Sequence, residues 1–332
     1  MSGAAPGPIG VVGGGAFGTA LAVATARTGK RVVLWARDPA QTETMSRERE
    51  NRLRLPGVRL DEAITPTSAI EALEGAQMLV IAVPAQALRG ACEALASVVR
   101  EPLSAIVCAK GIERKTKTFM SDIVRQVLPR AIPAILSGPS FAQDVAQGLP
   151  TAVVIAAEDA ALASKLAGAL SSRALRLYHT TDIRGVEIGG AAKNVVAIAA
   201  GIVEGRRLGD SARAALTARG FAELRRFAAA HGAKPETLMG LSGLGDLMLS
   251  TSTPKSRNFA LGLALGRGEA PDIAAHGKLA EGAFTASALC EMARLAGLSM
   301  PVSDCVAAIL ERKLSIEDAV DALMNRPVRS EE

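Results

Sequence analysis

The sequence predicts an α/β protein in which an N-terminal domain built on a parallel sheet precedes an all-helical domain. In the first half of the chain, short β-branched runs alternate with amphipathic helical patterns. From residue 182 to residue 325 almost no strand-like run occurs, and apolar residues recur at helical spacing. The 332 residues, 49% of them hydrophobic, exceed what a single core usually organises. We therefore expect two domains, residues 1–180 and 181–332.

The expected elements follow this division. Apolar strands joined by helical crossovers predict a parallel sheet with helices on both faces. The expected strands are Ile9–Val12, Val32–Trp35, Met78–Val83, Ala105–Ala109, Ala134–Ser137 and Ala152–Ala156. Helices are expected at Ala16–Arg27 and Ala85–Val99 between these strands, and at residues 182–204, 210–231, 284–296, 302–312 and 315–325 in the second domain.

The segment Ile9–Ala22 has the pattern of a strand, a glycine-rich turn and a helix. Gly13, Gly15 and Gly18 occupy the three positions of the GxGxxG motif. In this motif the first glycine permits a tight turn, the second lets a pyrophosphate approach the backbone, and the third lets the helix lie close to the strand. The helix N-terminus offers free amides and a positive dipole. The context favours a Rossmann-like dinucleotide site over a purely structural turn.

The end of the second expected strand bears on the choice of dinucleotide. An NAD-specific site usually places an acidic residue there, on the ribose hydroxyls. Here Trp35 and Ala36 are followed by Arg37, and a guanidinium can hold the 2′-phosphate of NADP in a fork. The pattern therefore favours NADPH (NADP+) as the cofactor. Asp38 comes one residue later and can reach a ribose, so NADH is a second candidate. The alternative for Arg37 is an ordinary exposed arginine.

Two charged residues stand alone in apolar surroundings. Lys193 is the only charged residue in Ile188–Val203, an expected helix. An ammonium is costly to bury, so Lys193 is a natural proton donor or acceptor; alternatively its amine reaches water along the helix. Asp246 is the only charged residue in Thr237–Pro254. Its carboxylate can hydrogen-bond Lys193 or a substrate hydroxyl, or it can cap the helix that begins nearby.

Three further segments suit a ligand. Lys110 directly follows an expected strand, and ligands of open parallel sheets bind at the carboxyl ends of strands. The segment Gly138–Ala142 follows another strand and suits a rigid loop that faces a ligand. The segment Ser256–Asn258 combines an arginine with two hydrogen-bonding neighbours, as a phosphate needs. For this tripeptide the alternative is the solvated start of a helix.

Composition argues against several other classes of protein. The net charge is +5 without a run of five basic residues, and aromatic residues make up 3%, so no nucleic-acid partner is expected. The cysteines form no CxxC pair and lie far from the histidines, so neither a metal site nor a disulfide framework is expected. The apolar stretch at residues 188–203 is too short and too polar to span a membrane. Without a secretory pattern at the N-terminus, a cytoplasmic location is expected.

Together these segments resemble the bacterial-type NAD(P)-dependent glycerol-3-phosphate dehydrogenases. The resemblance covers almost the whole chain, and its motifs occur in the family's order. They are Gly13–Ala22, Ala109–Gly111, Gly138–Ala142, Gly190–Asn194, Gly243–Leu247, Ser256–Asn258 and Ala280–Gly282. The resemblance implies a Rossmann-like domain followed by a helical domain of the 6-phosphogluconate-dehydrogenase-like kind, usually in a homodimer. It also implies reduction of dihydroxyacetone phosphate to sn-glycerol 3-phosphate for phospholipid synthesis.

The resemblance further implies a role for each matching residue, with Lys193 as the general acid/base and no metal ion. The implied substrate-binding residues are Lys110, Gly138, Ser140, Lys193, Asp246, Ser256, Arg257 and Asn258. The implied cofactor-binding residues are Gly13, Gly15, Ala16, Phe17, Gly18, Arg37, Lys110, Ala142, Arg257, Leu279 and Glu281. The chain departs from the family at Ala16-Phe17, where Ser-Trp is common, and within Ser250–Lys255.

In the implied mechanism a hydride passes to the carbonyl carbon, and protonated Lys193 stabilises the oxygen and delivers the proton. Arg257 anchors the phosphate at the far end, and this remote contact orients the carbonyl. Two alternatives remain. One is a related two-domain reductase for a 3-hydroxy acid or ketopantoate, which would not need Ser256–Asn258 for a phosphate. The other is a non-catalytic NADP(H)-sensing protein, against which Lys193 and Asp246 count.

Overall fold

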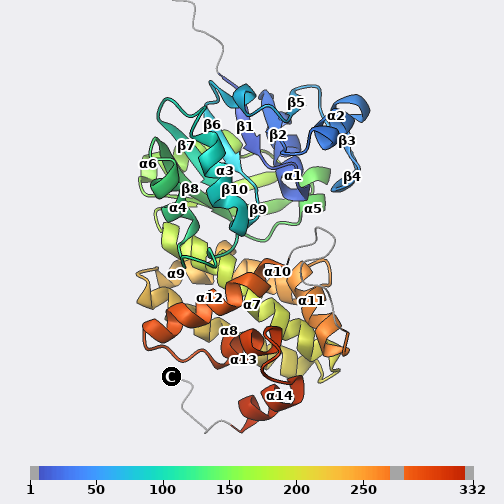
Figure 1. Cartoon of the computed structure of the whole chain (residues 1–332), viewed down its shortest axis with the longest axis vertical. Coiled ribbons are helices and arrows are strands. Elements are labelled where there is room, and N and C mark those ends of the chain that lie inside the picture. Colours follow the sequence, from blue (N-terminus) through green and yellow to red (C-terminus); the bar gives the residue numbers. More distant parts are fainter. Residues whose placement is uncertain (1–6, 270–279, 326–332) are drawn as a thin grey trace, which may run out of the picture. The chain divides into compact units, whose positions relative to one another are not determined.

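The structure of the chain is a computed structural model that describes residues 7–269 and 280–325. The chain divides into two compact units, coloured by sequence in Figure 1. Unit 1 comprises residues 1–110 and 118–187, and unit 2 comprises residues 111–117 and 188–332. The short segment 111–117 therefore groups with the second unit although it lies in the first half of the sequence.

Unit 1 is built on an eight-stranded sheet. In sheet order its strands are β10 (Leu175–Thr180), β9 (Thr151–Ala157), β8 (Ala131–Ser137), β7 (Leu103–Val107), β6 (Met78–Ile81), β1 (Ile9–Val12), β2 (Val32–Trp35) and β5 (Ile64–Thr67). Strands β1 and β6 are buried at every residue. Their unbroken apolar sequences therefore reflect a sheet that is covered on both faces.

The expected parallel pairing is confirmed from β5 through β2, β1, β6 and β7 to β8. The expectation of a fully parallel sheet is wrong at β8 and β9, which pair antiparallel with Ser137 opposite Val154. Strand β10 then pairs parallel with β9. A small antiparallel hairpin of β3 (Glu50–Asn51) and β4 (Leu55–Arg59) lies outside this sheet. The sequence did not predict β3, β4, β5 or β10.

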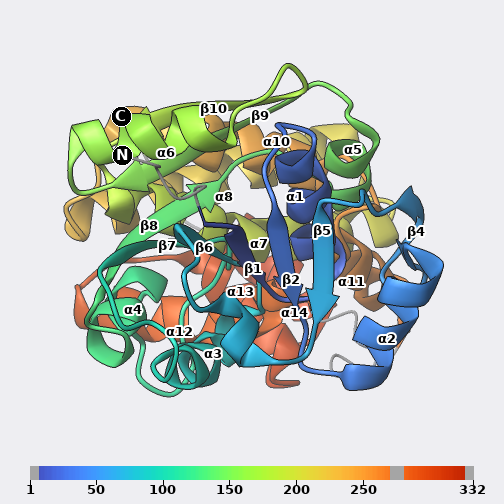
Figure 2. The same ribbon diagram turned by 90° about the horizontal axis from the view of Figure 1, so that it is seen from above.

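Helices cover both faces of the sheet, as expected. One apolar cluster joins the sheet to α1 (Ala16–Ala26), α5 (Ala142–Gln147) and α6 (Ala160–Leu170), and a second joins it to α3 (Leu88–Leu95) and α4 (Met120–Val127). Figure 2 shows these two groups on opposite sides of the strands. Neighbouring residues of β1 divide accordingly, since Val11 belongs to the first cluster and Val12 to the second. The remaining helices are α2 (Pro39–Glu48) and the 3-10 helices η1 (Ile70–Leu73) and η2 (Ala85–Ala87).

Within the described residues, unit 2 contains helices and no strand, which confirms the predicted all-helical domain. Helix α7 (Ile183–Gly205) begins in unit 1 and continues into unit 2. The others are α8 (Asp210–Ala230), α9 (Pro235–Met239), the π-helix η3 (Leu241–Gly245), α10 (Asp246–Thr251), α11 (Arg257–Gly266), α12 (Glu281–Leu295), α13 (Pro301–Leu310) and α14 (Ile316–Met324). The sequence predicted α7, α8, α12, α13 and α14 but not the elements from α9 to α11.

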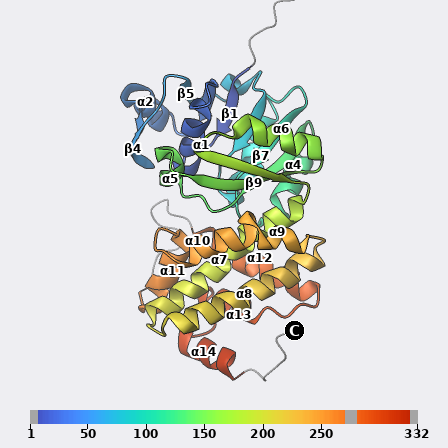
Figure 3. The same ribbon diagram turned by 180° about the vertical axis from the view of Figure 1, so that it is seen from behind.

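Helix α7 is the core of unit 2. By length and composition it could cross a membrane, but its apolar window is completely buried, as in the core helix of a soluble protein. Figure 3 shows α8 and α11 close to it. Gly201 and Gly205 of α7 face Gly262 and Gly266 of α11, and a Cβ added at Gly262 would lie 2.0 Å from the Ile198 carbonyl oxygen. The two helices therefore touch along their main chains.

A buried carboxylate fixes the first turn of α7 within unit 1. Glu187 accepts a hydrogen bond from the Ser121 amide at 2.7 Å, at the N-terminus of α4, and forms an ion pair with Arg184 at 3.1 Å. Arg184 also pairs with Asp122 at 2.9 Å. Burial raises the pKa of Glu187 to about 7, while the Arg184 charge acts in the opposite direction. This end of α7 is thus held by a group that titrates near neutral pH.

Candidate functional site

The glycine-rich turn joins β1 to α1 in unit 1, as the motif predicts. Gly13 has φ = +124°, and a Cβ there would lie 2.7 Å from the Ala82 carbonyl oxygen, so the turn requires glycine. A Cβ at Gly18 would lie 2.0 Å from the Gly13 carbonyl oxygen, so α1 starts directly against the turn. At Gly15, by contrast, a Cβ would meet no atom within 4 Å. The middle position of the motif is therefore open to a ligand.

The start of α1 has the properties of an anion site. Gly15 is the N-cap without a side-chain cap, and the first turn contains no acidic residue. Among the residues that the structure describes, the amides of Gly15, Ala16 and Phe17 donate no hydrogen bond. Ala16 and Phe17 are half-buried and pack against the core of unit 1. The free amides, the helix dipole and the open space at Gly15 fit a dinucleotide pyrophosphate.

The end of β2 presents a positive charge. Arg37 is exposed, and within the described part of the chain it has no hydrogen bond or ion pair. Asp38 instead serves as the N-cap of α2, where its carboxylate accepts from the Ala40 amide at 3.0 Å. One oxygen of the exposed Asp38 carboxylate is thus engaged in capping, whereas the Arg37 guanidinium is free to bind an anion.

Three of the expected substrate residues lie together in unit 1. Lys110 follows β7 and donates from Nζ to the Gly138 carbonyl oxygen at 2.9 Å, and Ser140 Oγ donates to the same oxygen at 3.1 Å. Gly138 has φ = +139°, and a Cβ there would lie 2.9 Å from the Cα of Val153. Ala142 begins α5 after this turn and is half-buried. The carboxyl ends of β7 and β8 thus bring an ammonium and a hydroxyl to one point.

Lys193 lies on α7 and is 6% exposed. Its Nζ donates to Asp246 Oδ1 at 2.9 Å and to Ser250 Oγ at 2.6 Å. Asp246 and Ser250 are each 2% exposed, and their side chains are 3.4 Å apart. Of the alternatives for Asp246, the structure shows the hydrogen bond to Lys193. It does not show a helix cap, because Gly245 is the N-cap of α10. The buried ammonium therefore has a buried counter-charge.

Close main-chain packing brings Asp246 to Lys193. Gly189 and Lys193 are four residues apart on α7 and so share a face of the helix. At Gly189 a Cβ would lie 2.8 Å from the Ser242 carbonyl oxygen and 3.1 Å from the Cα of Gly243, so the π-helix η3 rests on the α7 backbone. Asp246 follows η3 directly and reaches Lys193 one turn further along α7. Single-turn π-helices of this kind are frequent at functional sites.

The tripeptide Ser256–Asn258 starts helix α11. Ser256 is its N-cap and accepts from the Phe259 amide at 3.4 Å. Arg257 is exposed, and it makes no hydrogen bond or ion pair with the residues that the structure covers. Asn258 is buried. Ser256 therefore caps the helix but is buried, so the alternative of a solvated helix start does not describe it. The exposed Arg257 lies at the positive end of the helix.

The Asn258 amide joins three helices of unit 2. Its Nδ2 donates to Asn194 Oδ1 at 2.9 Å, and its Oδ1 accepts from the Gly282 amide at 2.9 Å. Asn194 follows Lys193 on α7, and Glu281 is the first residue of α12. The amide therefore fixes the starts of α11 and α12 against the middle of α7. Leu279, an expected cofactor-binding residue, lies outside the described residues.

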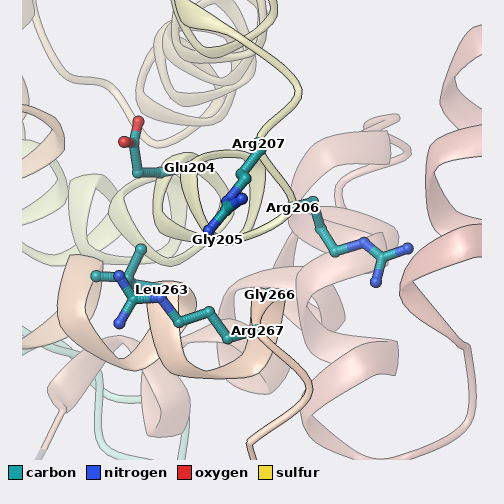
Figure 4. A pocket seen from close by; sticks show the side chains of 7 residues that line it. All are labelled: Glu204, Gly205, Arg206, Arg207, Leu263, Gly266 and Arg267. Atoms are coloured by element: carbon teal, nitrogen blue, oxygen red, sulfur yellow. The ribbon is translucent and has the colours of Figure 1, made fainter.

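Figure 4 shows a polar cavity of about 490 Å³ elsewhere in unit 2. None of the expected site residues lines it. Its arginines follow the C-terminal ends of α7 and α11, where helix dipoles and carbonyl groups favour cations over anions. One of them, Arg206, pairs with Glu317 at 2.5 Å. We therefore do not include this cavity in the candidate site. The lining residues are Glu204, Gly205, Arg206, Arg207, Leu263, Gly266 and Arg267.

Sequence reasoning missed some of these contacts. It did not select Ser250, although the residue lies four positions after Asp246 and shares a helix face with it. It also missed Gln41 and Asn51, whose side chains reach the glycine-rich turn. In the described residues, no group of three or more His, Cys, Asp or Glu side chains is placed to hold a metal ion.

Comparison with known proteins gives a consistent result. The model of the NAD-dependent glycerol-3-phosphate dehydrogenase N-terminus matches residues 8–163, and that of its C-terminus matches residues 182–321. Proteins named glycerol-3-phosphate dehydrogenase (NAD(P)+) from Azorhizobium caulinodans and Bradyrhizobium diazoefficiens are each 58% identical over 324 residues. These alignments cover 97% and 98% of this chain, respectively, and 98% of each relative.

A solved structure agrees with these relatives. The crystal structure of glycerol-3-phosphate dehydrogenase from Coxiella burnetii matches with a TM-score of 0.91 and 35% identity, covering 96% of this chain and 99% of that one. Two family models together match most of the chain, and relatives of more than half identity align along nearly all of it. The chain therefore belongs to the NAD-dependent glycerol-3-phosphate dehydrogenase family.

Proposed function

We propose that this protein reduces dihydroxyacetone phosphate to sn-glycerol 3-phosphate with NADPH, and that Lys193 is the general acid, or the general base in the reverse direction. The observation that carries the proposal is the buried Lys193 ammonium, held 2.9 Å from Asp246 Oδ1 and 2.6 Å from Ser250 Oγ. Carbonyl reduction builds negative charge on oxygen, and a fixed, buried ammonium stabilises that charge strongly. The family membership supplies the substrate class.

The bound dinucleotide supplies the hydride. Gly13, Gly15 and Gly18 shape the turn that receives the pyrophosphate, and the amides of Ala16 and Phe17 donate to it. Arg37 binds the 2′-phosphate of NADPH, while NADH, which lacks this group, is the weaker alternative. The remaining residues that we propose to contact the cofactor are Lys110, Ala142, Arg257, Leu279 and Glu281.

In the reaction, Lys193 Nζ donates a hydrogen bond to the substrate's carbonyl oxygen and transfers its proton as charge develops there. Asp246 balances the ammonium charge and, with Ser250, fixes the direction of the Nζ hydrogens. This pairing orients the ammonium without a rearrangement during the reaction.

The substrate's phosphate is bound by Arg257, which is exposed and makes no hydrogen bond or ion pair with other described residues. It stands at the N-terminus of α11, a ten-residue helix whose dipole favours an anion. The other proposed substrate contacts are Lys110, Gly138, Ser140, Asp246, Ser256 and Asn258. The buried amide of Asn258 also holds Asn194 and the start of α12 in place through its two hydrogen bonds.

The proposal extends to the protein's organisation and setting. Residues 1–180 form the NAD(P)-binding domain, and residues 181–332 form the helical domain that contains the proton donor Lys193. The protein works as a homodimer in the cytoplasm, where its product enters phospholipid synthesis. It neither binds nucleic acid nor inserts stably into a membrane; the complete burial of the α7 window supports the latter.

NADPH oxidation by the purified full-length chain tests the proposal. Dihydroxyacetone phosphate, dihydroxyacetone and ketopantoate are compared as substrates, and the product is identified with an enzyme specific for sn-glycerol 3-phosphate. Rapid turnover of dihydroxyacetone phosphate alone supports the proposal. Comparable turnover of dihydroxyacetone would refute the phosphate site, and turnover of ketopantoate alone would refute the substrate assignment.

A further inference from the structure

Two amide side chains of unit 1 hold the carbonyl oxygen of Gly14, which lies between the first two glycines of the motif. Gln41 Nε2 donates to this oxygen at 2.6 Å, and Asn51 Nδ2 donates to it at 3.0 Å. Gln41 lies in the first turns of α2, and Asn51 lies in β3. Two elements outside the β1–α1 motif thus converge on one peptide group of the turn.

These amides belong to a closed hydrogen-bond network. Asn51 is 2% exposed, and its Nδ2 also donates to Thr19 Oγ1 on α1 at 2.7 Å. Its Oδ1 accepts from Gln41 Nε2 at 3.3 Å. Thr19 is completely buried. Both N–H groups and the oxygen of the Asn51 amide therefore have hydrogen-bond partners, which fixes the orientation of the amide. A flipped amide would lose these hydrogen bonds and is therefore unfavourable.

The geometry of the peptide group transmits this constraint. In a trans peptide the C=O and the following N–H point in opposite directions. Fixing the Gly14 oxygen toward Gln41 and Asn51 therefore aims the Gly15 N–H away from them. This peptide joins two glycines, Gly14 and Gly15, which by themselves allow it to rotate through many conformations. A larger residue at position 14 cannot restrict this rotation instead, since a Cβ at Gly14 would lie 2.5 Å from the Cβ of Ala36.

We infer that Asn51 and Gln41 are positioning residues that set the Gly14–Gly15 peptide so that the Gly15 amide faces the pyrophosphate before the cofactor binds. This inference rests on the proposed binding of the dinucleotide at the glycine-rich turn. Neither side chain touches the cofactor. Each acts by removing a conformational freedom that binding would otherwise have to remove.

The inference predicts how the affinities for NADPH and NADH change relative to one another. The pyrophosphate is common to NADPH and NADH, so loss of the network weakens both by the same factor. Loss of the Arg37 guanidinium, in contrast, weakens NADPH much more than NADH. Chemistry in the bound complex is less affected, because the network does not contact the reacting atoms, so KM for the cofactor rises while kcat changes little.

The test compares Asn51→Leu and Gln41→Leu with the matched control Thr19→Val. Leucine keeps the branched shape of the Asn51 side chain but donates no hydrogen bond. Thr19→Val removes the other partner of the same amide and leaves both donors on the Gly14 oxygen. We expect Asn51→Leu to weaken the binding of NADPH and of NADH equally, by roughly tenfold, and Gln41→Leu to weaken the binding of both by roughly threefold. Thr19→Val should lower the Tm but leave both dissociation constants within about twofold of wild type.

Nucleotide affinity is measured by titration of the purified full chain, with Tm and steady-state kinetics recorded for the same samples. Unchanged affinities in folded Asn51→Leu and Gln41→Leu, or equal losses in Thr19→Val and Asn51→Leu, would overturn the inference. If Asn51→Leu does not fold, Gln41→Leu decides, because Gln41 is only partly buried. Failure of wild type to bind either dinucleotide would instead refute the proposed function.

Discussion

Replacing Lys193 by methionine removes the ammonium but keeps most of the side chain's length, and it leaves a carboxylate without its ion partner. The Lys193 and Asp246 side chains are 8% and 3% exposed, with a nitrogen–oxygen distance of 2.9 Å. Removing one member of such a buried pair typically costs about 3–5 kcal/mol. At about 2–4 °C of Tm per kcal/mol for a domain of this size, we expect the Tm to fall by about 6–20 °C.

The double variant Lys193→Met/Asp246→Leu separates this structural cost from the chemical role. Replacing both charges by apolar groups of similar volume is commonly close to neutral, so most of the lost stability should return. Activity should not return, because the proton donor is still missing. Both variants should retain affinity for NADPH, while kcat with dihydroxyacetone phosphate falls by about 10²-fold or more.

Thermal unfolding, nucleotide titration and NADPH oxidation on the same preparations give the three quantities. Near-normal turnover in Lys193→Met would show that another group protonates the substrate. Full stability of the single variant would show that the buried carboxylate does not need its partner. Recovery of both stability and activity in the double variant would mean that Lys193 acts only through the fold.

Three further results are expected. Arg37→Ala should raise KM for NADPH by roughly tenfold or more and KM for NADH far less, because a charged hydrogen bond is lost; equal effects would remove the 2′-phosphate role. Wild type should prefer dihydroxyacetone phosphate to dihydroxyacetone by up to ~10⁴-fold in kcat/KM. Arg257→Ala should reduce this preference, and Arg257→Lys should restore only part of it. An unchanged preference in Arg257→Ala would show that another residue binds the phosphate. Finally, burial raises the pKa of Glu187 to about 7. Between pH 4.5, the ordinary pKa of glutamate, and pH 7, the folded state therefore keeps a proton on Glu187 that the unfolded state has released. Wild type should therefore lose about 3 kcal/mol of unfolding free energy relative to Glu187→Gln as pH rises from 4.5 to 7, and a pH-independent difference in denaturant titrations would contradict this assignment.

The parts of the fold that the sequence predicted are those in which one physical requirement dominates. Strands β1 and β6 are buried on both faces, so they must be apolar throughout, and a continuous apolar run is easy to recognise. Strand β10 escaped prediction because it is an edge strand whose exposed residues include Arg176 and Tyr178. Strand β5 contains Pro66, which lacks a backbone N–H for the sheet and therefore argued against a strand at this position. The antiparallel pairing of β8 with β9 depends on how the segment that connects them packs, which local sequence does not encode.

The candidate site shows the same division. Lys193 and Asp246 could be selected because a lone charge in an apolar stretch needs an explanation, and their hydrogen bond supplies one. Ser250 and Asn51 carry no such signal, since uncharged polar residues occur throughout a protein surface. Their importance comes from burial and from partners far away in sequence, as in the contact of Asn51 with Gly14. Only the folded backbone brings such groups together.

The main-chain contact between α7 and α11 also bears on the length of substrate that the protein accepts. Lys193 lies on α7 and Arg257 at the start of α11, and the two helices meet through Gly201 and Gly262 with no side chain between them. Side chains in a core can adjust to a substitution, but two touching backbones cannot move closer. Under the proposed function, the pair therefore sets a minimum span from carbonyl to phosphate, which the two helices cannot shorten. Gly262→Ala would push the helices apart, lengthen that span and weaken the binding of dihydroxyacetone phosphate.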